Sequence, residues 1–328
     1  MKAAVCDRPG SPDVIRVAEV DTPAVPTDGV LVRVHAASVN PVDLFALAAV
    51  RHFARWTAAR GKRQPEIMGH DFAGTVAAVG NAVTKFRVGD EVFGAHTGAF
   101  AEYLSVPERA GIVHKPANAS FAEAAAVPVA ALTALHAVRD HGRLQPGQRV
   151  LVNGASGGVG HFAVQIAKAL GGEVTAVCSS TKVDTARELG ADHVIDYTRE
   201  DFTEGDRRHD LIIDIAGSRP WSRCIRVMEP GATLVITGAS AHMHSAWRML
   251  AHMAATRLAA IPGSRRAAFF IARVTRDDLG VLGEMLATGR MRSVIDERYP
   301  LCEVAAACRQ LSAGHARGKI VVDMEASR

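Results

Sequence analysis

The pattern of hydrophobic and polar positions changes twice along the 328-residue chain. Residues 1 to about 118 carry short apolar runs, such as Val30–His35 and Gly74–Val79, separated by glycine-rich turns. Runs of this length with such punctuation predict an all-β region with tight turns. Within this region, the Ala- and Arg-rich segment Ala46–Lys62 is compatible with either a helix or an ordered loop.

From about Phe121 to Gly238, short apolar strand cores alternate with helical or loop segments. The segment after the first strand core carries apolar residues with helical spacing between Val159 and Leu170. Strands that alternate with helices predict βαβ units, and therefore a parallel, doubly wound sheet. The five strand cores are Val150–Val152, Val174–Cys178, Val194–Ile195, Leu211–Ile215 and Leu234–Thr237.

Beyond Gly238 the pattern predicts further elements of both kinds. Ala241–Ala260 is a long helix candidate, and the apolar run Phe269–Val274 predicts a strand. A second helix is expected near Asp277–Thr288, and a last strand at Ile320–Asp323.

Composition places the chain among folded globular proteins. Hydrophobic residues make up 48% of the chain and charged residues 22%, which is sufficient for a large core. The formal net charge of +4 is mild and the basic residues form no stripe, which counts against a nucleic-acid-binding protein. The longest stretches without charge, Val150–Ala167 and Pro230–Trp247, are interrupted by glycines and do not resemble membrane-spanning helices.

The cysteines and the first residues bear on the cellular compartment. The ten N-terminal residues contain no apolar signal segment. No two cysteines form a Cys-x-x-Cys pair, so reduced thiols in a cytoplasmic protein are expected. The five cysteines are Cys6, Cys178, Cys224, Cys302 and Cys308.

A glycine-rich stretch at Val150–Gly160 carries the strongest chemical signal. It follows a predicted strand and opens an amphipathic helix, the context in which backbone N–H groups and a helix N-terminus bind a pyrophosphate. The alternative is a tight turn without a ligand. The candidate dinucleotide-binding residues are Gly154, Ala155, Ser156, Gly157, Gly158, Val159 and Gly160.

The end of the second strand indicates which dinucleotide binds. It carries Ser179, Ser180 and Lys182, and no acidic residue precedes Asp184. A carboxylate there would accept a hydrogen bond from the ribose 2′-hydroxyl of NADH, whereas two hydroxyls and a lysine suit the 2′-phosphate of NADPH. A charge-assisted hydrogen bond contributes roughly 1.5–3 kcal/mol, so NADPH is favoured. Alternatively, Lys182 is a solvated lysine at a helix start.

Several motifs spread over almost the whole chain resemble one family. The chain is similar to the zinc-independent quinone oxidoreductase-like branch of the medium-chain dehydrogenase/reductase superfamily. Besides the glycine stretch, the matching segments are Asn40–Asp43, Gly69–Val76, Val88–Gly94, Gly98–Tyr103, Ala130–His136 and Glu188–Tyr197.

This resemblance implies an α/β fold in which a doubly wound parallel (Rossmann) sheet is inserted in a mostly β GroES-like catalytic domain. The expected boundaries are 1–120 for the first part of the catalytic domain, 121–260 for the Rossmann domain and 261–328 for the return to the catalytic domain. The active site is expected in the cleft between the two domains.

The resemblance also implies further cofactor contacts. Tyr197 is expected near the adenosine 2′-phosphate, Thr133 facing the glycine stretch, and Lys319 reaching toward the cofactor. The residues expected at the nicotinamide end are Ala216, Gly217, Gly238 and Ala239.

Comparison with zinc-dependent relatives argues against a metal. The first ligand position falls at Asp43 or its neighbour, His70 stands alone, and the third position falls in the apolar stretch 126–130. A tetrahedral zinc site needs three protein ligands and a water. His70 and Asp71 are therefore expected to form a hydrogen-bonded structural pair, and His242 and His244 to lie in a pocket wall or on the surface.

The expected reaction is hydride delivery from NADPH to a quinone or an α,β-unsaturated ketone. Asn40 is the first candidate for orienting the nicotinamide or the substrate, although it is equally suited to cap the turn before Pro41. The segment Leu44–Phe53 contains no tyrosine, which leaves water or His52 as the proton donor.

The aromatic residues of this region are candidates for the substrate pocket. Phe45, Phe53 and Trp56 are suited to contact a flat ring, although ordinary core packing explains them equally well. Alternative functions are an enoyl-thioester reductase of polyketide or fatty-acyl metabolism and a non-catalytic NADPH-binding protein. An apolar edge strand at Phe269–Val274 favours a homodimer, because pairing with a twin strand would cover it.

Overall fold

The computed structural model describes residues 1–8, 10–47, 66–237, 264–314 and 316–324. It divides into two compact units, one made of Met1–Val129 together with Val274–Arg328, the other of Ala130–Arg273. We call these the first and the second unit. The second unit is thus inserted into the sequence of the first, which agrees with the predicted insertion.

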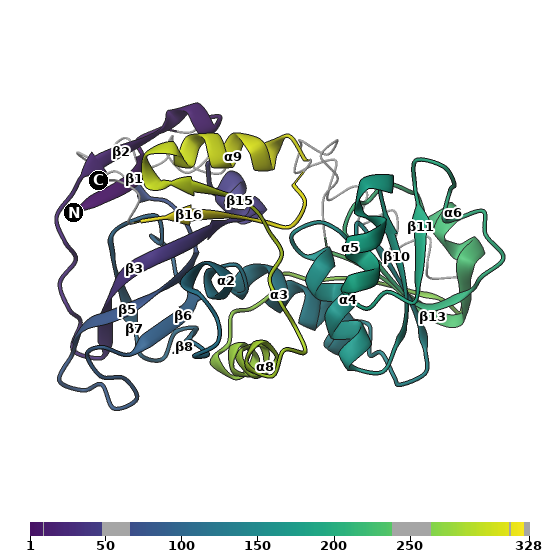
Figure 1. Ribbon diagram of the computed structural model, residues 1–328, viewed down its shortest axis with the longest axis horizontal. Helices are drawn as coiled ribbons and strands as arrows, with labels where there is room; N and C mark the ends of the chain where they lie inside the picture. The colour runs from purple at the N-terminus through teal and green to yellow at the C-terminus, as the bar shows by residue number, and fades with distance from the viewer. Residues whose placement is uncertain (9, 48–65, 238–263, 315, 325–328) are drawn as a thin grey trace. The chain divides into compact units, whose positions relative to one another are not determined.

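The first unit is built on a seven-stranded, mostly antiparallel sheet (Figure 1). The strand order is β15-β16-β3-β5-β6-β8, and β7 also pairs with β3. Strand β3 pairs with β5, β7 and β16, so it positions residues that are far apart in the sequence. The strands are β3 (Gly29–Val39), β5 (Asp71–Val79), β6 (Glu91–Ala95), β7 (Tyr103–Pro107), β8 (Ile112–His114), β15 (Ile295–Pro300) and β16 (Lys319–Asp323).

The first unit also contains a smaller sheet and the helices α2, α8 and α9, and α3 crosses the sequence boundary between the two units. The small sheet has the order β2-β1-β4. Helix α9 packs on β15 and β16, as Figure 1 shows. These elements are β1 (Lys2–Cys6), β2 (Ile15–Glu19), β4 (Glu66–Ile67), α2 (Phe121–Ala125), α3 (Pro128–Leu135), α8 (Arg276–Ala287) and α9 (Val304–Ser312).

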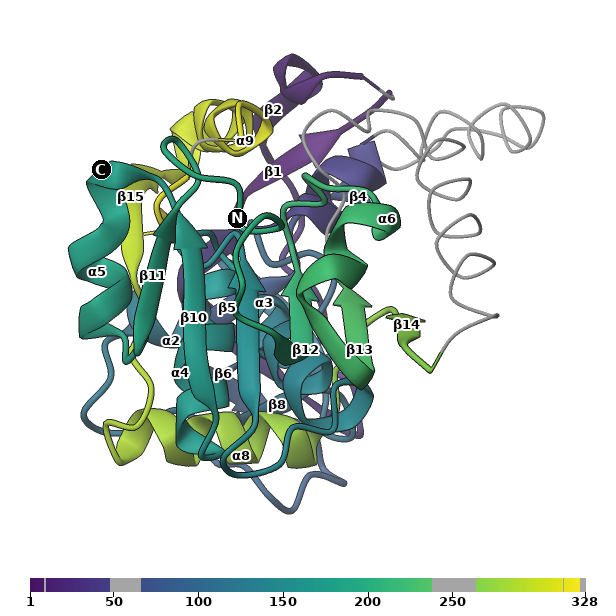
Figure 2. The same cartoon turned by 90° about the vertical axis from the view of Figure 1, so that its right-hand side faces the viewer.

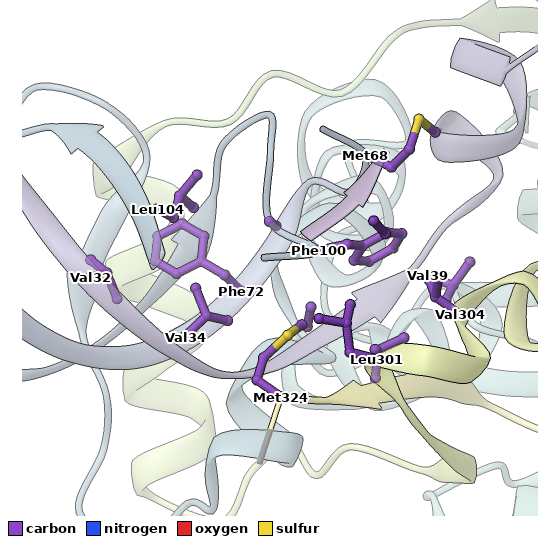
Figure 3. Close-up of a cluster of buried hydrophobic side chains, with 14 of the residues drawn as sticks. Val32, Val34, Val39, Met68, Phe72, Phe100, Leu104, Leu301, Val304 and Met324 are labelled. Atoms are coloured by element: carbon purple, nitrogen blue, oxygen red, sulfur yellow. The ribbon is translucent and has the colours of Figure 1, made fainter. Parts of the chain in front are cut away.

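The core of the first unit joins the two ends of the chain. Figure 3 shows Phe72 and Val34 from the central strands close to Leu301 and Met324 from the C-terminal segment. Because Phe72 and Leu301 are completely buried, the hydrophobic effect holds the C-terminal segment in this unit.

The second unit contains a six-stranded sheet with the order β11-β10-β9-β12-β13-β14 (Figure 2). All neighbouring strands run parallel. The strand order reverses between β9 and β12, which makes the carboxyl ends of these two strands the expected binding place in such a sheet. The elements are β9 (Arg149–Asn153), α4 (Gly160–Ala169), β10 (Glu173–Cys178), α5 (Val183–Glu188), β11 (His193–Asp196), β12 (His209–Asp214), α6 (Trp221–Cys224), β13 (Met228–Ile236) and β14 (Arg266–Phe269).

The predicted fold class is confirmed, and the boundaries of the units differ from those expected. The first boundary falls after Val129 and not at 120, because α2 packs on β3 and β5 of the first unit. The second falls after Arg273 and not at 260, because β14 pairs with β13 and therefore belongs to the parallel sheet.

Two of the predicted elements after Gly238 are confirmed and one is wrong in its bounds. Helix α8 and strand β16 occupy the expected places. The strand expected at Phe269–Val274 is instead β14, Arg266–Phe269, since the backbone leaves the sheet after Phe269. The segments Ala46–Lys62, in all but its first two residues, and Ala241–Ala260 lie outside the described residues. No helix within the described ranges is long and apolar enough to cross a bilayer.

Candidate functional site

The glycine stretch forms the turn between β9 and α4. Gly154 has a φ of +88°, a backbone conformation that residues with a side chain rarely adopt. A Cβ atom on Gly160 would lie 2.0 Å from the carbonyl oxygen of Gly154, so only glycine lets the helix start this close to the strand. These two glycines shape the turn.

Gly157 has a different surrounding. A Cβ atom placed on it would meet only the Gly154 carbonyl oxygen, at 3.5 Å, so space is open beside it. The first turn of α4 has no side-chain cap, which leaves N–H groups and the positive end of the helix dipole available for an anion. The turn therefore fits a pyrophosphate group, and the residues between Gly154 and Gly160 would hold it.

The loop after β12 is tied to the end of β9. The Asn153 side chain donates to Asp214 Oδ1 at 2.7 Å and to Ser218 Oγ at 3.0 Å. The Gly217 backbone N–H also donates to Asp214 Oδ1, at 2.9 Å. The Ala216 backbone nitrogen would lie 3.3 Å from a Cβ on Gly154. The structure therefore brings Ala216 and Gly217 beside the glycine turn, at the point where the strand order reverses.

The end of β10 holds the residues expected to select the dinucleotide. Ser180 and Lys182 form a short 3-10 turn that leads into α5, and the Tyr197 side chain is exposed just after β11. The Tyr197 backbone N–H donates to the Cys178 carbonyl oxygen at 3.1 Å, so the ends of β10 and β11 lie side by side. The structure brings these predicted residues together.

Sequence analysis missed a carboxylate at this edge. Asp196 ends β11 and pairs with Cys178 in the sheet register. Ser180 Oγ donates to Asp196 Oδ2 at 2.5 Å. The signal was present in the sequence, because the carboxyl ends of neighbouring parallel strands meet at one edge of a sheet. An acidic residue at the end of the third strand, such as Asp196, therefore lies next to the end of the second strand.

The pKa of the Cys178 thiol is shifted by burial and by the charged residues near the end of β10. Burial raises the pKa of this thiol, and the negative charge of Asp196 raises it further. The positive charges of Lys182 and Arg187 act on it in the opposite direction. Charges of both signs therefore surround the end of β10.

In the first unit, six polar residues form a cluster between strands and helix. Asn40 follows β3 and precedes the helical residues 41–47, and Asp71 begins β5. Every member of the cluster is buried except His70, whose side chain is 26% exposed. Buried polar groups require partners, so the hydrogen bonds determine what each can do. The six are Ser38, Asn40, Asp43, His70, Asp71 and Lys319.

Both side-chain N–H groups of Asn40 donate to other groups of the protein. Its nitrogen donates to the Ser38 carbonyl oxygen at 3.2 Å and to Asp71 Oδ2 at 2.8 Å. Its oxygen accepts from Lys319 Nζ at 2.5 Å. A carboxylate on one side and an ammonium on the other determine which end is oxygen. In this structure both N–H groups of the amide donate within the cluster, and the role of Asn40 in orienting a nicotinamide or a substrate stays a prediction.

The backbone of Asn40 lies at the start of the helical residues 41–47, and the capping side chain there is that of Asp43, not that of Asn40. The Asn40 N–H donates to Asp43 Oδ2 at 2.7 Å, and the Asp43 N–H donates to the Asn40 carbonyl oxygen at 3.0 Å. Such reciprocal bonds, with Pro41 at the first helical position, are typical of a helix start. Asn40 therefore holds the start of this helix against the sheet.

Lys319, which the resemblance implies reaches toward the cofactor, makes its described contacts within this cluster. Its ammonium group is buried and donates to Asn40 Oδ1 and, at 3.3 Å, to the Val39 carbonyl oxygen. Asp71 Oδ2 lies 3.8 Å away. Burial lowers the pKa of Lys319 and raises that of Asp71, although each charge opposes the shift of the other. Lys319 ties the C-terminal strand β16 to β3 and β5.

His70 pairs with Asp43 and not with the neighbouring Asp71. Its Nδ1 lies 2.6 Å from Asp43 Oδ1. This hydrogen bond raises the pKa of His70 above its usual value, against the effect of burial. The side chain of Asp71 is instead turned toward Asn40 and the Val129 N–H, which donates to it at 3.0 Å. Among the described residues, no three His, Cys, Asp or Glu side chains are placed to hold one metal ion.

The remaining predicted residues are only partly described. Thr133 lies on α3 and is half-buried, and the Phe45 side chain is exposed. The other expected contacts lie outside the described residues. They are His52, Phe53, Trp56, Gly238, Ala239, His242 and His244.

Known proteins share both the sequence and the fold. Residues 26–117 match the alcohol dehydrogenase GroES-like domain, and residues 189–322 match the zinc-binding dehydrogenase family. The chain is 31% identical over 336 residues to a chloroplastic quinone-oxidoreductase homolog of Spinacia oleracea, covering 96% of this chain and 95% of the relative.

Two further relatives extend this result. The 2-methylene-furan-3-one reductase of Solanum lycopersicum is 33% identical over 329 residues, which cover 95% of this chain and 76% of the relative. The structure of the quinone oxidoreductase from Coxiella burnetii superposes with a TM-score of 0.84 at 30% identity, over 99% of both chains. The chain therefore belongs to the medium-chain dehydrogenase/reductase superfamily, in its quinone oxidoreductase-like branch.

Proposed function

We propose that the protein is a reductase that uses NADPH to deliver a hydride to a quinone or an α,β-unsaturated ketone, without a metal. The observation that carries the proposal is the glycine turn between β9 and α4, together with Ser180 and Lys182 after β10 and Tyr197 after β11. The names of relatives support the substrate class. They include quinone oxidoreductases, a furanone reductase and an NADPH-dependent alkenal/one oxidoreductase of Arabidopsis thaliana.

The cofactor supplies the hydride, and the protein binds and orients it. The N–H groups at the start of α4 would bind the pyrophosphate. Lys182 and Tyr197 would lie beside the 2′-phosphate. The hydrogen bonds between Asn153, Asp214 and Gly217 keep the edge of the sheet in a rigid shape beside them.

For the substrate, the proposal uses the chemistry of conjugate reduction. Hydride adds to the β-carbon of an enone, and water supplies the proton that the α-carbon takes up. Phe45, whose side chain is 52% exposed, is proposed to contact the flat ring of the substrate. The proposal involves no metal, and in it Asp43 serves to hold His70 and the Asn40 N–H.

Direct nucleotide titration tests the cofactor site. NADPH and NADH are titrated into the pure protein while fluorescence is recorded, and oxidation of NADPH by small quinones and enones is then assayed. In Lys182→Glu, the Kd for NADPH is expected to rise by roughly tenfold or more, since a charge-assisted bond worth about 1.5–3 kcal/mol becomes a repulsion. The Kd for NADH is expected to change little. An unchanged preference would show that Lys182 does not select the nucleotide.

The same proposal includes a homodimer in the cytoplasm. Strand β14 is at the end of the parallel sheet, and Ile271 just beyond it is 92% exposed. A second copy that pairs along β14 would cover both. Four of the five cysteines are buried thiols, which suits a reducing compartment.

A further inference from the structure

Asp196 stands among the residues proposed to select NADPH. Its side chain is only 13% exposed, and its register partner Cys178 ends the neighbouring strand. The hydrogen bonds from Ser180 and Thr198 lower the pKa of Asp196, so it carries a full negative charge at neutral pH. A 2′-phosphate bound beside Lys182 would therefore meet a carboxylate as well as a lysine.

The hydrogen bonds of Asp196 leave one acceptor position. Oδ1 accepts from the Thr198 backbone N–H at 3.0 Å and from the Thr198 hydroxyl at 2.7 Å. Oδ2 accepts from Ser180 Oγ at 2.5 Å, and the exposed guanidinium of Arg199 lies 3.6 Å from it. Each carboxylate oxygen offers two lone pairs, so Oδ2 can still accept from a ribose hydroxyl.

The hydrogen bond from Ser180 Oγ to Asp196 uses the hydroxyl proton that Ser180 would otherwise donate to a phosphate. Ser180 directs its proton to Asp196, and its contact with Thr198 Oγ1, at 2.9 Å, joins a second hydroxyl to the group. If Ser180 donated to a 2′-phosphate, Asp196 would lose a hydrogen bond while a second negative charge came close. Both changes oppose the binding of NADPH, and neither affects NADH.

We propose that Asp196 determines the nucleotide selectivity by opposing Lys182, so that the protein prefers NADPH only modestly and also binds NADH. This inference rests on the proposed function, since it assumes that the dinucleotide lies along the glycine turn. Asp196 is a selectivity residue here and takes no part in hydride transfer.

The test is a titration of Asp196→Asn with NADPH and with NADH. The amide has the shape of the carboxylate, and its oxygen can still accept from Thr198. Its nitrogen would donate to Ser180 Oγ in place of the present bond, and the charge is lost. The Kd for NADPH is expected to fall by about tenfold, whereas the Kd for NADH stays equal or rises. The difference in the Kd for NADPH between Asp196→Asn and the unmodified protein should shrink as ionic strength rises, because salt screens charges near the surface. A melting curve without nucleotide checks that the variant is folded.

The matched control is Asp206→Asn. Asp206 is exposed and lies just before β12, so it stands at the amino edge of the same sheet. Removing its charge should leave both Kd values unchanged. Ser180→Ala provides a second variant that keeps the Asp196 charge. This substitution should weaken the binding of NADPH more than that of NADH, since the Asp196 carboxylate loses the hydrogen bond from the Ser180 hydroxyl.

The outcomes separate this inference from the proposed function. If Asp196→Asn leaves both Kd values unchanged while Lys182→Glu shifts the preference, Asp196 has no part in selectivity and the cofactor site stands. If Asp196→Asn weakens both nucleotides equally and lowers the melting temperature, its role is structural and the inference is overturned. If the unmodified protein binds neither nucleotide, both proposals fail.

Discussion

At the scale of single residues, the buried ammonium group of Lys319 depends on the partners around it. Its ammonium has three acceptors around it, on Val39, Asn40 and Asp71, and all are in the first unit. Burial opposes the charged form of both Lys319 and Asp71, so each ion depends on the other. Such a pair stabilises the fold only while it is complete.

Lys319→Met is therefore expected to lower the free energy of unfolding by roughly 3–5 kcal/mol, since it leaves Asp71 buried without a cation. Urea unfolding at neutral pH measures the loss. The double variant Lys319→Met with Asp71→Asn should recover much of it, because the orphaned charge is gone. A variant of normal stability that binds NADPH poorly would instead support the role of Lys319 as a cofactor contact.

At the scale of elements, the turn between β9 and α4 combines two kinds of glycine. Gly160 is needed because the helix begins in contact with the Gly154 carbonyl oxygen, whereas Gly157 borders open space. Gly160 is required for the packing of the helix on the sheet, whereas the open space beside Gly157 is where the proposed dinucleotide would lie. A sequence motif cannot distinguish the two cases, because both positions are glycine.

Two alanine substitutions should separate these requirements. Gly160→Ala is expected to lower the stability by about 1–3 kcal/mol or more, because its Cβ would clash with backbone and not with a flexible side chain. Gly157→Ala should melt like the unmodified protein and bind NADPH more weakly, since the methyl group occupies the space next to the turn. Thermal melting and fluorescence titration measure the two effects. Equal melting temperatures for both variants would contradict this assignment.

At the scale of the whole molecule, the edge of the parallel sheet bears on assembly. Strand β14 pairs with β13 on one side and is the last strand of the described sheet. Its apolar residues continue into exposed Ile271. Among the described residues only β13 pairs with β14, and an edge strand of this kind favours self-association, so pairing of two copies would protect it.

Sedimentation velocity at micromolar concentration is expected to give twice the mass of one chain. Ile271→Asp should shift the protein toward the monomer, because it places a charge in the covered edge. Val88→Asp, at a position that is 63% exposed in the first unit, is the control and should remain dimeric. A mass near one chain for the unmodified protein would contradict the dimer.

The sequence by itself determined the fold class and the glycine turn of this protein. Alternating strand and helix patterns specify a parallel sheet, and a glycine stretch between strand and helix has few other uses. These signals are local, so they can be recognised without knowing which distant residues meet. The positions of β9, α4, β10 and β16 were predicted for this reason.

Only the tertiary structure decided the partners of the polar residues. His70 turned out to pair with Asp43, Asn40 with Lys319, and Ser180 with Asp196. Each pair joins residues from segments that are separate in the sequence, and hydrogen bonds depend on atoms within about 3 Å, which sequence spacing does not specify. The strand end at Phe269 was likewise set by pairing with β13. Long-range contact thus decided what each polar side chain can do.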